Sequence, residues 1–331
     1  MFGVTSARLL ALAAVAGILL MAPPVAAASA RGNPFRGARL YVDPESAAAR
    51  QVRDWRDNRP HDARLVKKIA DQPEADWLGE WYADPAAHVR DQIAHRLSPA
   101  HATAFFALYA IPHRDCAGYS GGSMGSGDAY RAWVDQIAGA IGRYPAIVLV
   151  EPDALPEVGC LSHAAQKERL GLEAYATRRL GALPRTSVYI DAGSANWGNP
   201  RRIVRLLRAA GVRHARGFAL GTTSFDRTAD NLRYGRRIGR ALHGKHFIVN
   251  TARNGRGPLP RARARSRQDM WCNPPDRGLG ARPTTHTRSR LADAYAWTNH
   301  PGYSDGPCNG GPPAGQWWAQ YALGLARRAA F

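Results

Sequence analysis

Short apolar runs alternate along the chain with amphipathic stretches of helical spacing. Two runs, Ala104–Ala110 and Ala146–Val150, have the length and composition of buried strands, and the stretch Asp128–Arg143 between them has the period of a helix. Together they predict one β-helix-β unit. Parallel strands joined in this way end at the same edge of the sheet, which is where α/β folds place their chemistry.

The same alternation predicts the remaining elements. Further strands are expected at Leu40–Val42, Ala75–Glu80, Ser187–Ile190, Gly217–Leu220, Phe247–Asn250 and Ala294–Trp297. Further helices are expected at Glu45–Arg56, Pro85–Leu97, Ala164–Leu183, Asn199–Ala210, Thr228–Leu242 and Gly315–Arg328. The sequence has no internal repeat and no Pro/Ser/Thr-rich linker. We therefore predict an α/β fold, a distorted (β/α) barrel of seven or eight parallel strands in a single domain.

The first thirty residues have the pattern of a secretory signal peptide. An apolar run, Leu9–Met21, leads to the small residues Ala28–Ala30, which are typical of a cleavage site. The alternative is a membrane anchor, for which the run is short. We expect residues 1–30 to be removed, residues 31–331 to form one secreted domain, and no later segment to insert into a membrane.

The four cysteines are Cys116, Cys160, Cys272 and Cys308. They form an even set without C-x-x-C spacing or clustered histidines, which favours disulfides over a zinc site. Three pairings are open from the sequence. The local pairing, Cys116 with Cys160 and Cys272 with Cys308, would close two loops that each carry an acidic residue.

The formal net charge of +19 comes mainly from arginine, spread along the chain and dense in Arg253–Arg267. Attraction to an anionic cell-wall polymer or to nucleic acid is one interpretation, and a solvated arginine-rich surface is the simpler one. No stacking aromatics or nucleic-acid motif accompany the run, so we expect no nucleic-acid partner.

Four aspartates, Asp115, Asp153, Asp191 and Asp305, each follow an expected strand within a few residues. In a barrel they would converge on one mouth, where mutual repulsion raises their pKa values and can keep one of them protonated. A protonated acid facing an ionised carboxylate is what cleavage of a glycosidic bond requires. Taken singly, each of these aspartates could instead cap a helix, and Asp191 is the most suitable for that. Glu151 could orient a neighbouring residue.

Aromatic residues add a substrate class. Tyr109, Trp77, Trp197 and Trp271 lie near expected strand ends, and flat rings beside carboxylates suit the apolar faces of sugars. Packing in the core is the alternative for each, and we assign Trp297 to the core.

Other chemistries fit less well. The sequence has no Walker loop, dinucleotide fingerprint or H-E-x-x-H motif, and we expect no metal and no cofactor. The glycine-rich run Gly122–Gly127 lacks the lysine of a phosphate loop. We interpret it as a mobile lid or a loop, with Ser120 and Ser123 available to bind water or sugar.

Several segments resemble, in order along the chain, those of glycoside hydrolase family 6, the cellulases formerly called family B. They are YAIPHRDC, VLVEPDALP, YIDAG, ARGFAL, NTARNGRGP, WCNPP and SDG. The resemblance implies that residues 31–331 are a catalytic domain that hydrolyses β-1,4-glucosidic bonds with inversion and without a metal. It also implies the two local disulfides.

The resemblance further assigns roles to single residues. Asp153 matches the general acid, and Asp115 matches the carboxylate that keeps this acid protonated and manages the catalytic water. Asp305 matches the proposed base. The remaining matches are a further site aspartate, a tyrosine that presses on the sugar ring and two sugar platforms, here Asp191, Tyr109, Trp197 and Trp271.

Four positions depart from the family pattern. Asn299 and Tyr303 stand where a lysine and a glutamate are usual, Ser194 stands for a histidine, and Gly221 for an asparagine. All four changes are expected to remove polar groups that line the sugar site. Hydrolysis is still expected, but the preferred glucan is not determined by the sequence. Asn299 and Tyr303 are candidates for binding the substrate.

Loop lengths bear on the mode of attack. About 44 positions separate the first two cysteines and about 36 the last two, which is short beside the family's tunnel-forming members. We expect an open cleft, internal cutting of soluble or amorphous glucan, and a monomer. The alternatives are a hydrolase of a different β-glucan and a glycan-binding relative with little turnover.

Overall fold

The computed structural model describes residues 1–3, 32–116 and 118–331. The expected signal peptide, residues 1–30, thus lies almost wholly outside the described residues and stays a prediction. Within the described ranges, no helix combines the length and the apolar character needed to cross a bilayer.

A single sheet of parallel strands forms the centre of the molecule, in the spatial order of the chain. Its strands are β1 (Asp76–Leu78), β2 (Ala104–Leu108), β3 (Ala146–Val150), β4 (Thr186–Asp191), β5 (Gly217–Leu220), β6 (His246–Asn250) and β7 (Ala292–Ala296). The sheet curls so that the segments flanking its two edges meet, with Ala75 N donating to the Trp297 carbonyl at 3.1 Å. The expected single-domain α/β barrel is confirmed, with seven strands and as a half-barrel.

The strands are buried on both faces because side chains alternate between the inside of the curl and the outside. In β2, Phe105 and Ala107 belong to the inner cluster, whereas Phe106 and Leu108 join the outer cluster against the helices. All five residues of β2 and of β3 are buried. This explains why these strands appear in the sequence as continuous apolar runs.

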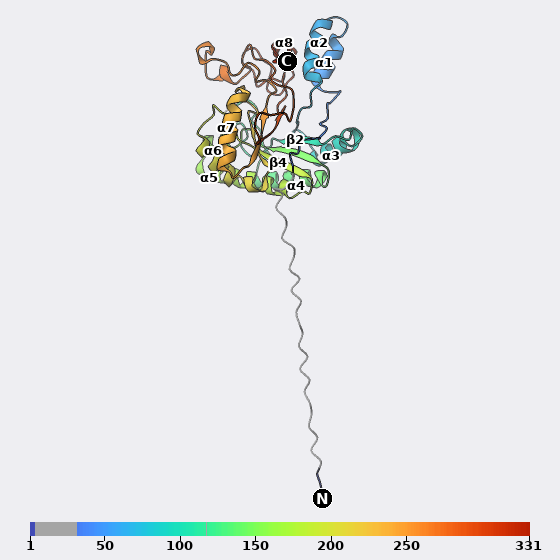
Figure 1. Ribbon diagram of the computed structural model, residues 1–331, viewed down its shortest axis with the longest axis vertical. Helices are drawn as coiled ribbons and strands as arrows, with labels where there is room; N and C mark the ends of the chain where they lie inside the picture. The colour runs from blue at the N-terminus through green and yellow to red at the C-terminus, as the bar shows by residue number, and fades with distance from the viewer. Residues whose placement is uncertain (4–31, 117) are drawn as a thin grey trace.

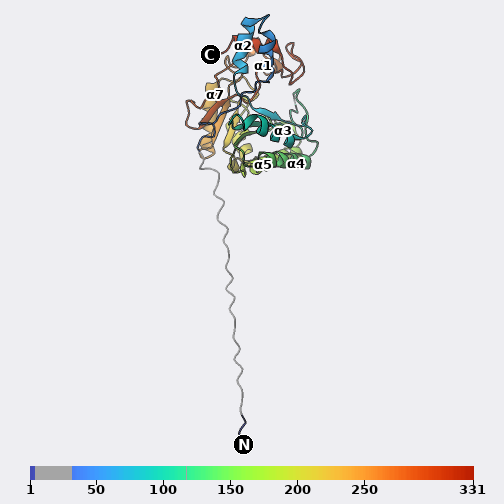
Figure 2. The same cartoon turned by 90° about the vertical axis from the view of Figure 1, so that its right-hand side faces the viewer.

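Helices surround the sheet (Figure 1). They are α1 (Ala47–Trp55), α2 (Pro60–Ala70), α3 (Pro85–Asp91), α4 (Gly127–Ile141), α5 (His163–Gly181), α6 (Pro200–Ala209), α7 (Thr228–Ala241) and α8 (Ala319–Arg327). The α1 and α2 helices pack against each other and α2 packs against α8, in a group at one end of the molecule (Figures 1 and 2).

Three sequence-based expectations differ from the structure. The expected strand Leu40–Val42 is wrong, since it makes only an isolated bridge from Leu40 to Thr103 in the described part of the chain. The α2 helix was not predicted. The last helix begins at Ala319 rather than Gly315, because Trp317 and Trp318 lie in an extended segment that pairs with the loop after β7.

Candidate active site

The carboxyl ends of the strands open into a cleft of about 1190 Å³. Of the residues predicted for the site, the cleft is lined by Trp77, Tyr109, Asp115, Ser120, Asp153, Trp197, Trp271, Asn299, Tyr303 and Asp305. Asp191 does not line the cleft and lies buried beneath Asp153. The fold therefore brings together acids that are far apart in the sequence.

The backbone turns sharply where the acids stand. Asp115, Glu151 and Asp153 have φ angles of 50°, 46° and 70°, in the left-handed region that L-residues rarely adopt. The buried Glu151 carboxylate accepts hydrogen bonds from Ala110 N at 3.0 Å and Ile111 N at 3.1 Å. Glu151 thus ties the end of β3 to the end of β2 and orients its neighbours, as one sequence interpretation proposed.

Asp153 has the environment of a proton donor. Its side chain is buried, at 7% exposure, and its Oδ1 accepts a hydrogen bond from the Thr223 hydroxyl at 2.6 Å. Burial raises the pKa of Asp153 well above its usual value, and the charges of Asp191 and Glu157 raise it further. Because Oδ1 is already an acceptor, Oδ2 is the oxygen that can carry the proton.

Asp191 supports this acid from below. Its Oδ2 accepts from Asp153 N at 3.1 Å and from Gly193 N at 3.0 Å. Burial raises the pKa of Asp191 to about 6, although the two backbone N–H groups oppose the rise. Asp191 therefore fixes the backbone of the acid and adds negative charge beneath it.

Asp115 stands on the loop after β2, where its Oδ2 accepts a hydrogen bond from Ser120 N. Burial raises the pKa of Asp115, and the Asp305 charge also raises it, while the Ser120 N–H and the Arg114 guanidinium oppose the rise. Ser120 thus holds the carboxylate through its backbone.

Asp305 has both of its carboxylate oxygens engaged. Arg253 Nη1 lies 2.7 Å from Oδ1, and Asn273 N donates to Oδ2 at 3.0 Å. Asp305 N in turn donates to Asn273 Oδ1 at 2.8 Å, and Cys272, which precedes Asn273, is bonded to Cys308. Asp305 is therefore held in place by an almost fully buried arginine and by a disulfide-bonded loop.

The sequence analysis missed a further carboxyl, Glu157, which also lines the cleft. It follows Asp153 by one helical turn, with Glu157 N donating to the Asp153 carbonyl at 3.0 Å. Burial and the Asp115 charge raise its pKa to about 7, and its Oε2 is buried without a hydrogen bond among the described residues. The spacing of four residues in EPDALPE was the available signal. Thr223 and Arg253 were also missed.

Aromatic rings form the walls of the cleft. The rings of Trp77 and Tyr109 pack edge to face, with 4.8 Å between their centres. The Arg114 guanidinium lies 4.3 Å from the centre of the Tyr109 ring. Trp197 and Trp271 are 38% and 36% exposed, so their rings are available to a ligand. Trp297 is fully buried, which confirms its assignment to the core.

The four departures from the family pattern do not all lie in the cleft. Asn299 lines it and donates to the Thr222 carbonyl at 3.0 Å, and Tyr303 lines it as well. Ser194 and Gly221 do not themselves line the cleft. Ser194 is fully buried and its short side chain donates to Asp226 at 2.6 Å, within a network behind the cleft.

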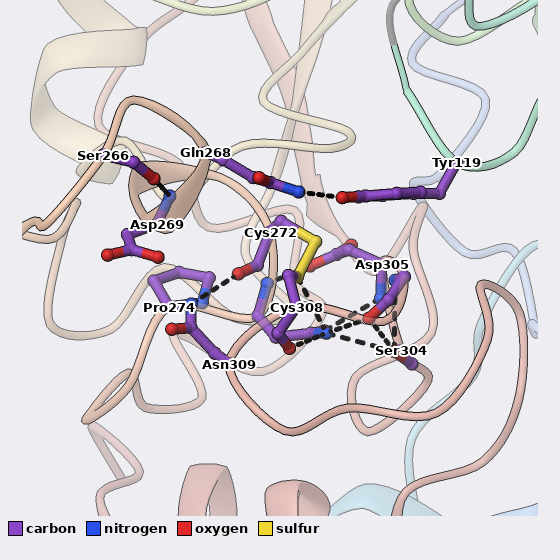
Figure 3. Close-up of a disulfide and its surroundings, with 12 residues drawn as sticks. Tyr119, Ser266, Gln268, Asp269, Cys272, Pro274, Ser304, Asp305, Cys308 and Asn309 are labelled. Carbon is purple, nitrogen blue, oxygen red and sulfur yellow. Dashed lines mark hydrogen bonds between the residues drawn. A yellow bond between two sulfur atoms is a disulfide. The ribbon is translucent and has the colours of Figure 1, made fainter.

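Two disulfides restrain the loops of the site. Cys116 is bonded to Cys160, which links the loop after β2 to the loop after β3, and Cys272 is bonded to Cys308, which links the loops after β6 and β7. The expected local pairing is therefore confirmed. A hydrogen bond from Gln268 to Tyr119 connects the two loop pairs (Figure 3).

A buried acid with a raised pKa, neighbouring carboxylates and exposed aromatic rings in one cleft are the parts from which glycoside hydrolases are built. The site therefore defines the class as a glycoside hydrolase. The family model of glycosyl hydrolases family 6 matches residues 35–329. The chain belongs to this family.

Individual relatives are consistent with membership of this family. Endoglucanase A of Cellulomonas fimi is 41% identical over 293 residues, which cover 88% of this chain and 61% of that protein. Endoglucanase 1 of Streptomyces halstedii is 35% identical, with 86% of this chain and 87% of that protein covered. The structure of the endoglucanase Cel6 from Mycobacterium tuberculosis, solved with a thio-linked cello-oligosaccharide, has a TM-score of 0.83 and 38% identity, covering 90% of this chain and 99% of that one.

Proposed function

We propose that the protein is a secreted, inverting endo-β-1,4-glucanase that cuts internal bonds of soluble or amorphous glucan. The observation that carries the proposal is the environment of Asp153, a buried carboxyl with a raised pKa in a cleft walled by aromatic rings. Family membership, relatives named endoglucanase and the cello-oligosaccharide bound to the M. tuberculosis enzyme support it.

In this mechanism the Asp153 proton passes from Oδ2 to the glycosidic oxygen as the bond to the anomeric carbon breaks. A water molecule attacks that carbon from the opposite face and inverts its configuration, which requires carboxyl groups about 6.5–9.5 Å apart. The leaving sugar takes the proton from Asp153, and a second carboxylate receives the proton that the water loses.

We assign that second role to Asp115, directly or through a further water. Burial raises the pKa of Asp115, which favours its taking up a proton. Arg253 and Asn273 N, in contrast, already engage both oxygens of Asp305. In this assignment Asp305, which the sequence resemblance matches to the base, contributes charge and position. Asp305→Asn should then retain more activity than Asp115→Asn at the same pH.

The decisive experiment is hydrolysis of a neutral soluble β-1,4-glucan, followed by release of reducing ends and by NMR of the newly formed anomer. Wild type should release the α-anomer first, and Asp153→Asn should lose at least about 10²-fold in kcat. Full activity of Asp153→Asn would refute the assignment of the acid. Binding without turnover would favour the glycan-binding alternative, and faster turnover of another β-glucan would favour the different substrate.

Two finer points need their own measurements. The chain-length distribution of early products separates internal cutting from release of cellobiose, which matters because the Aspergillus niger relative named a probable cellobiohydrolase is 27% identical. Secretion and a monomeric state remain proposals, testable by N-terminal sequencing of protein from the culture medium and by light scattering.

A further inference from the structure

Basic residues are spread along the chain, but the excess of positive over negative charge is concentrated in one segment. The whole chain has 45 Lys and Arg residues against 26 Asp and Glu residues, whereas residues 192–268 alone have 18 against 2. This segment, about a quarter of the chain, therefore supplies +16 of the net charge of +19. The remainder is nearly neutral.

Within this segment, two neighbouring helices carry much of the charge. The α6 and α7 helices pack against each other on the outside of the sheet (Figure 1). Their buried residues, such as Leu207 and Ile238, face the core. We call the opposite, solvent-facing side the α6–α7 arginine face, formed by the exposed Arg201, Arg202, Arg205, Arg208, Arg233, Arg237 and Arg240.

These arginines have almost no acidic partners. Asp230 pairs with Arg233, and no other residue of the α6–α7 arginine face has a carboxylate within ion-pair distance in the described part of the chain. Arg201 and Arg205 stand four residues apart on one helix, an arrangement of like charges that destabilises a helix. No carboxylate of the described residues lies against this pair, so the face keeps an uncompensated positive charge that can attract an anion.

The other exposed residues on this face limit the classes of ligand that could bind there. Apart from arginine, the fully exposed residues of the two helices are small, namely Ala209, Ala229 and Ala241, and the larger Leu206 and Tyr234 are partly buried against the core. The face therefore has no large exposed apolar side chain that could insert into a membrane. Guanidinium groups do bind carboxylates, often through two hydrogen bonds. The face therefore fits a polymer that is recognised through repeated negative charge.

Its place beside the cleft suggests what kind of polymer. The α6 helix begins three residues after Trp197, which lines the cleft, and Arg202 Nη1 lies 3.4 Å from the carbonyl of Pro156, another cleft residue. We propose that the α6–α7 arginine face binds an acidic polysaccharide, a linear sugar polymer bearing carboxylates, beside the cleft that holds neutral glucan. This goes beyond the proposed hydrolysis and does not depend on it.

Two variants of equal net charge test the proposal. The face variant combines Arg201→Gln, Arg205→Gln, Arg237→Gln and Arg240→Gln, whose side chains are exposed and make no hydrogen bond or ion pair with the described residues. The control combines Arg56→Gln, Arg64→Gln, Arg143→Gln and Arg185→Gln, which are also exposed and lie outside the segment. Binding of polygalacturonate is measured for each across a range of salt concentrations.

We expect the face variant to bind polygalacturonate at least about tenfold more weakly than wild type at low salt, with a shallower dependence on salt, and the control to stay within about twofold. Equal losses in both variants would overturn the proposal, because net charge alone would then explain binding. Absence of binding by wild type at low salt would also overturn it.

Two further measurements separate the ligand class from the enzyme activity. Tighter binding of polyphosphate or single-stranded DNA than of polygalacturonate, at equal ionic strength, would refute the carboxylate assignment. Hydrolysis of neutral hydroxyethylcellulose should be the same for wild type and both variants. Failure of all three to hydrolyse it would contradict the proposed function and leave the binding result standing.

Discussion

Replacing Glu157 with glutamine should stabilise the protein in neutral and alkaline solution. Its pKa is raised from 4.5 to about 7, so ionising this carboxyl in the folded protein costs more than in the unfolded chain. By linkage this difference corresponds to about 3 kcal/mol, which solvent in the cleft reduces to about 2 kcal/mol. The stability is fully present below pH 4.5 and is lost as the pH rises toward 7.

Thermal unfolding measured from pH 4 to pH 8 tests this. At pH 4 the wild-type carboxyl is neutral in both states, so Glu157→Gln there reports only the exchange of one neutral group for another. At pH 8 the variant should melt about 4–8 °C above wild type, taking about 2–4 °C per kcal/mol. Glu168→Gln, the same change at an exposed position on α5, is the control. Equal melting temperatures of Glu157→Gln and wild type across this range would refute the reasoning.

The same variant should also move the activity profile. Ionised Glu157 raises the pKa of Asp153, together with Asp191 and Asp115. Removing its charge lowers that pKa, and the alkaline limb of kcat/KM should shift to lower pH. An unchanged limb would mean that Glu157 does not act on the proton donor. If Glu157→Gln is more stable but less active at alkaline pH, the charge of Glu157 acts on Asp153. A role of Glu157 in packing alone would not produce both changes.

Three other variants test the frame of the site. Asp305→Asn leaves the buried Arg253 without its ion pair and should cost about 3–5 kcal/mol of stability, measured by denaturant unfolding. Replacing Cys272 and Cys308 with serine opens a loop of 36 residues and should cost about 4 kcal/mol, and a melting temperature within error of wild type would contradict this. Trp197→Ala should raise KM for a soluble glucan more than it lowers kcat, because the exposed ring contributes binding rather than chemistry.

The strands and the meeting of the acids could be predicted because they follow from local patterns. Continuous apolar runs such as Ala146–Val150 occur where a parallel strand is covered on both faces, and the acids after such strands share one edge. The α2 helix was also within reach. It has proline at its first position and buries Val66 and Ile69 at helical spacing, and both features are signals of a helix in the sequence.

Other features arise only from the assembled fold. Thr223 follows β5 and reaches Asp153 across the sheet, and Arg253 reaches Asp305 from the loop after β6. No short-range pattern pairs residues that are 70 or 52 positions apart. The hydrogen bond from Ser194 to Asp226 is a further example, because it joins residues 32 positions apart in a buried network that no local pattern predicts.

The backbone at Asp115, Glu151 and Asp153 shows why the site needs the structure around it. None of the three is glycine, yet all have left-handed φ angles, a conformation that costs about 1–2 kcal/mol for each such residue. Two kinds of restraint hold them there: the hydrogen bonds from Ala110 N and Ile111 N to Glu151, and the Cys116 disulfide next to Asp115. Burial then adds the cost of keeping several carboxyl groups close together. The strained backbone and the raised pKa of the proton donor therefore arise at one place, because the turn that holds Asp153 at a φ of 70° also buries its carboxyl group, and relaxing that turn would remove both together.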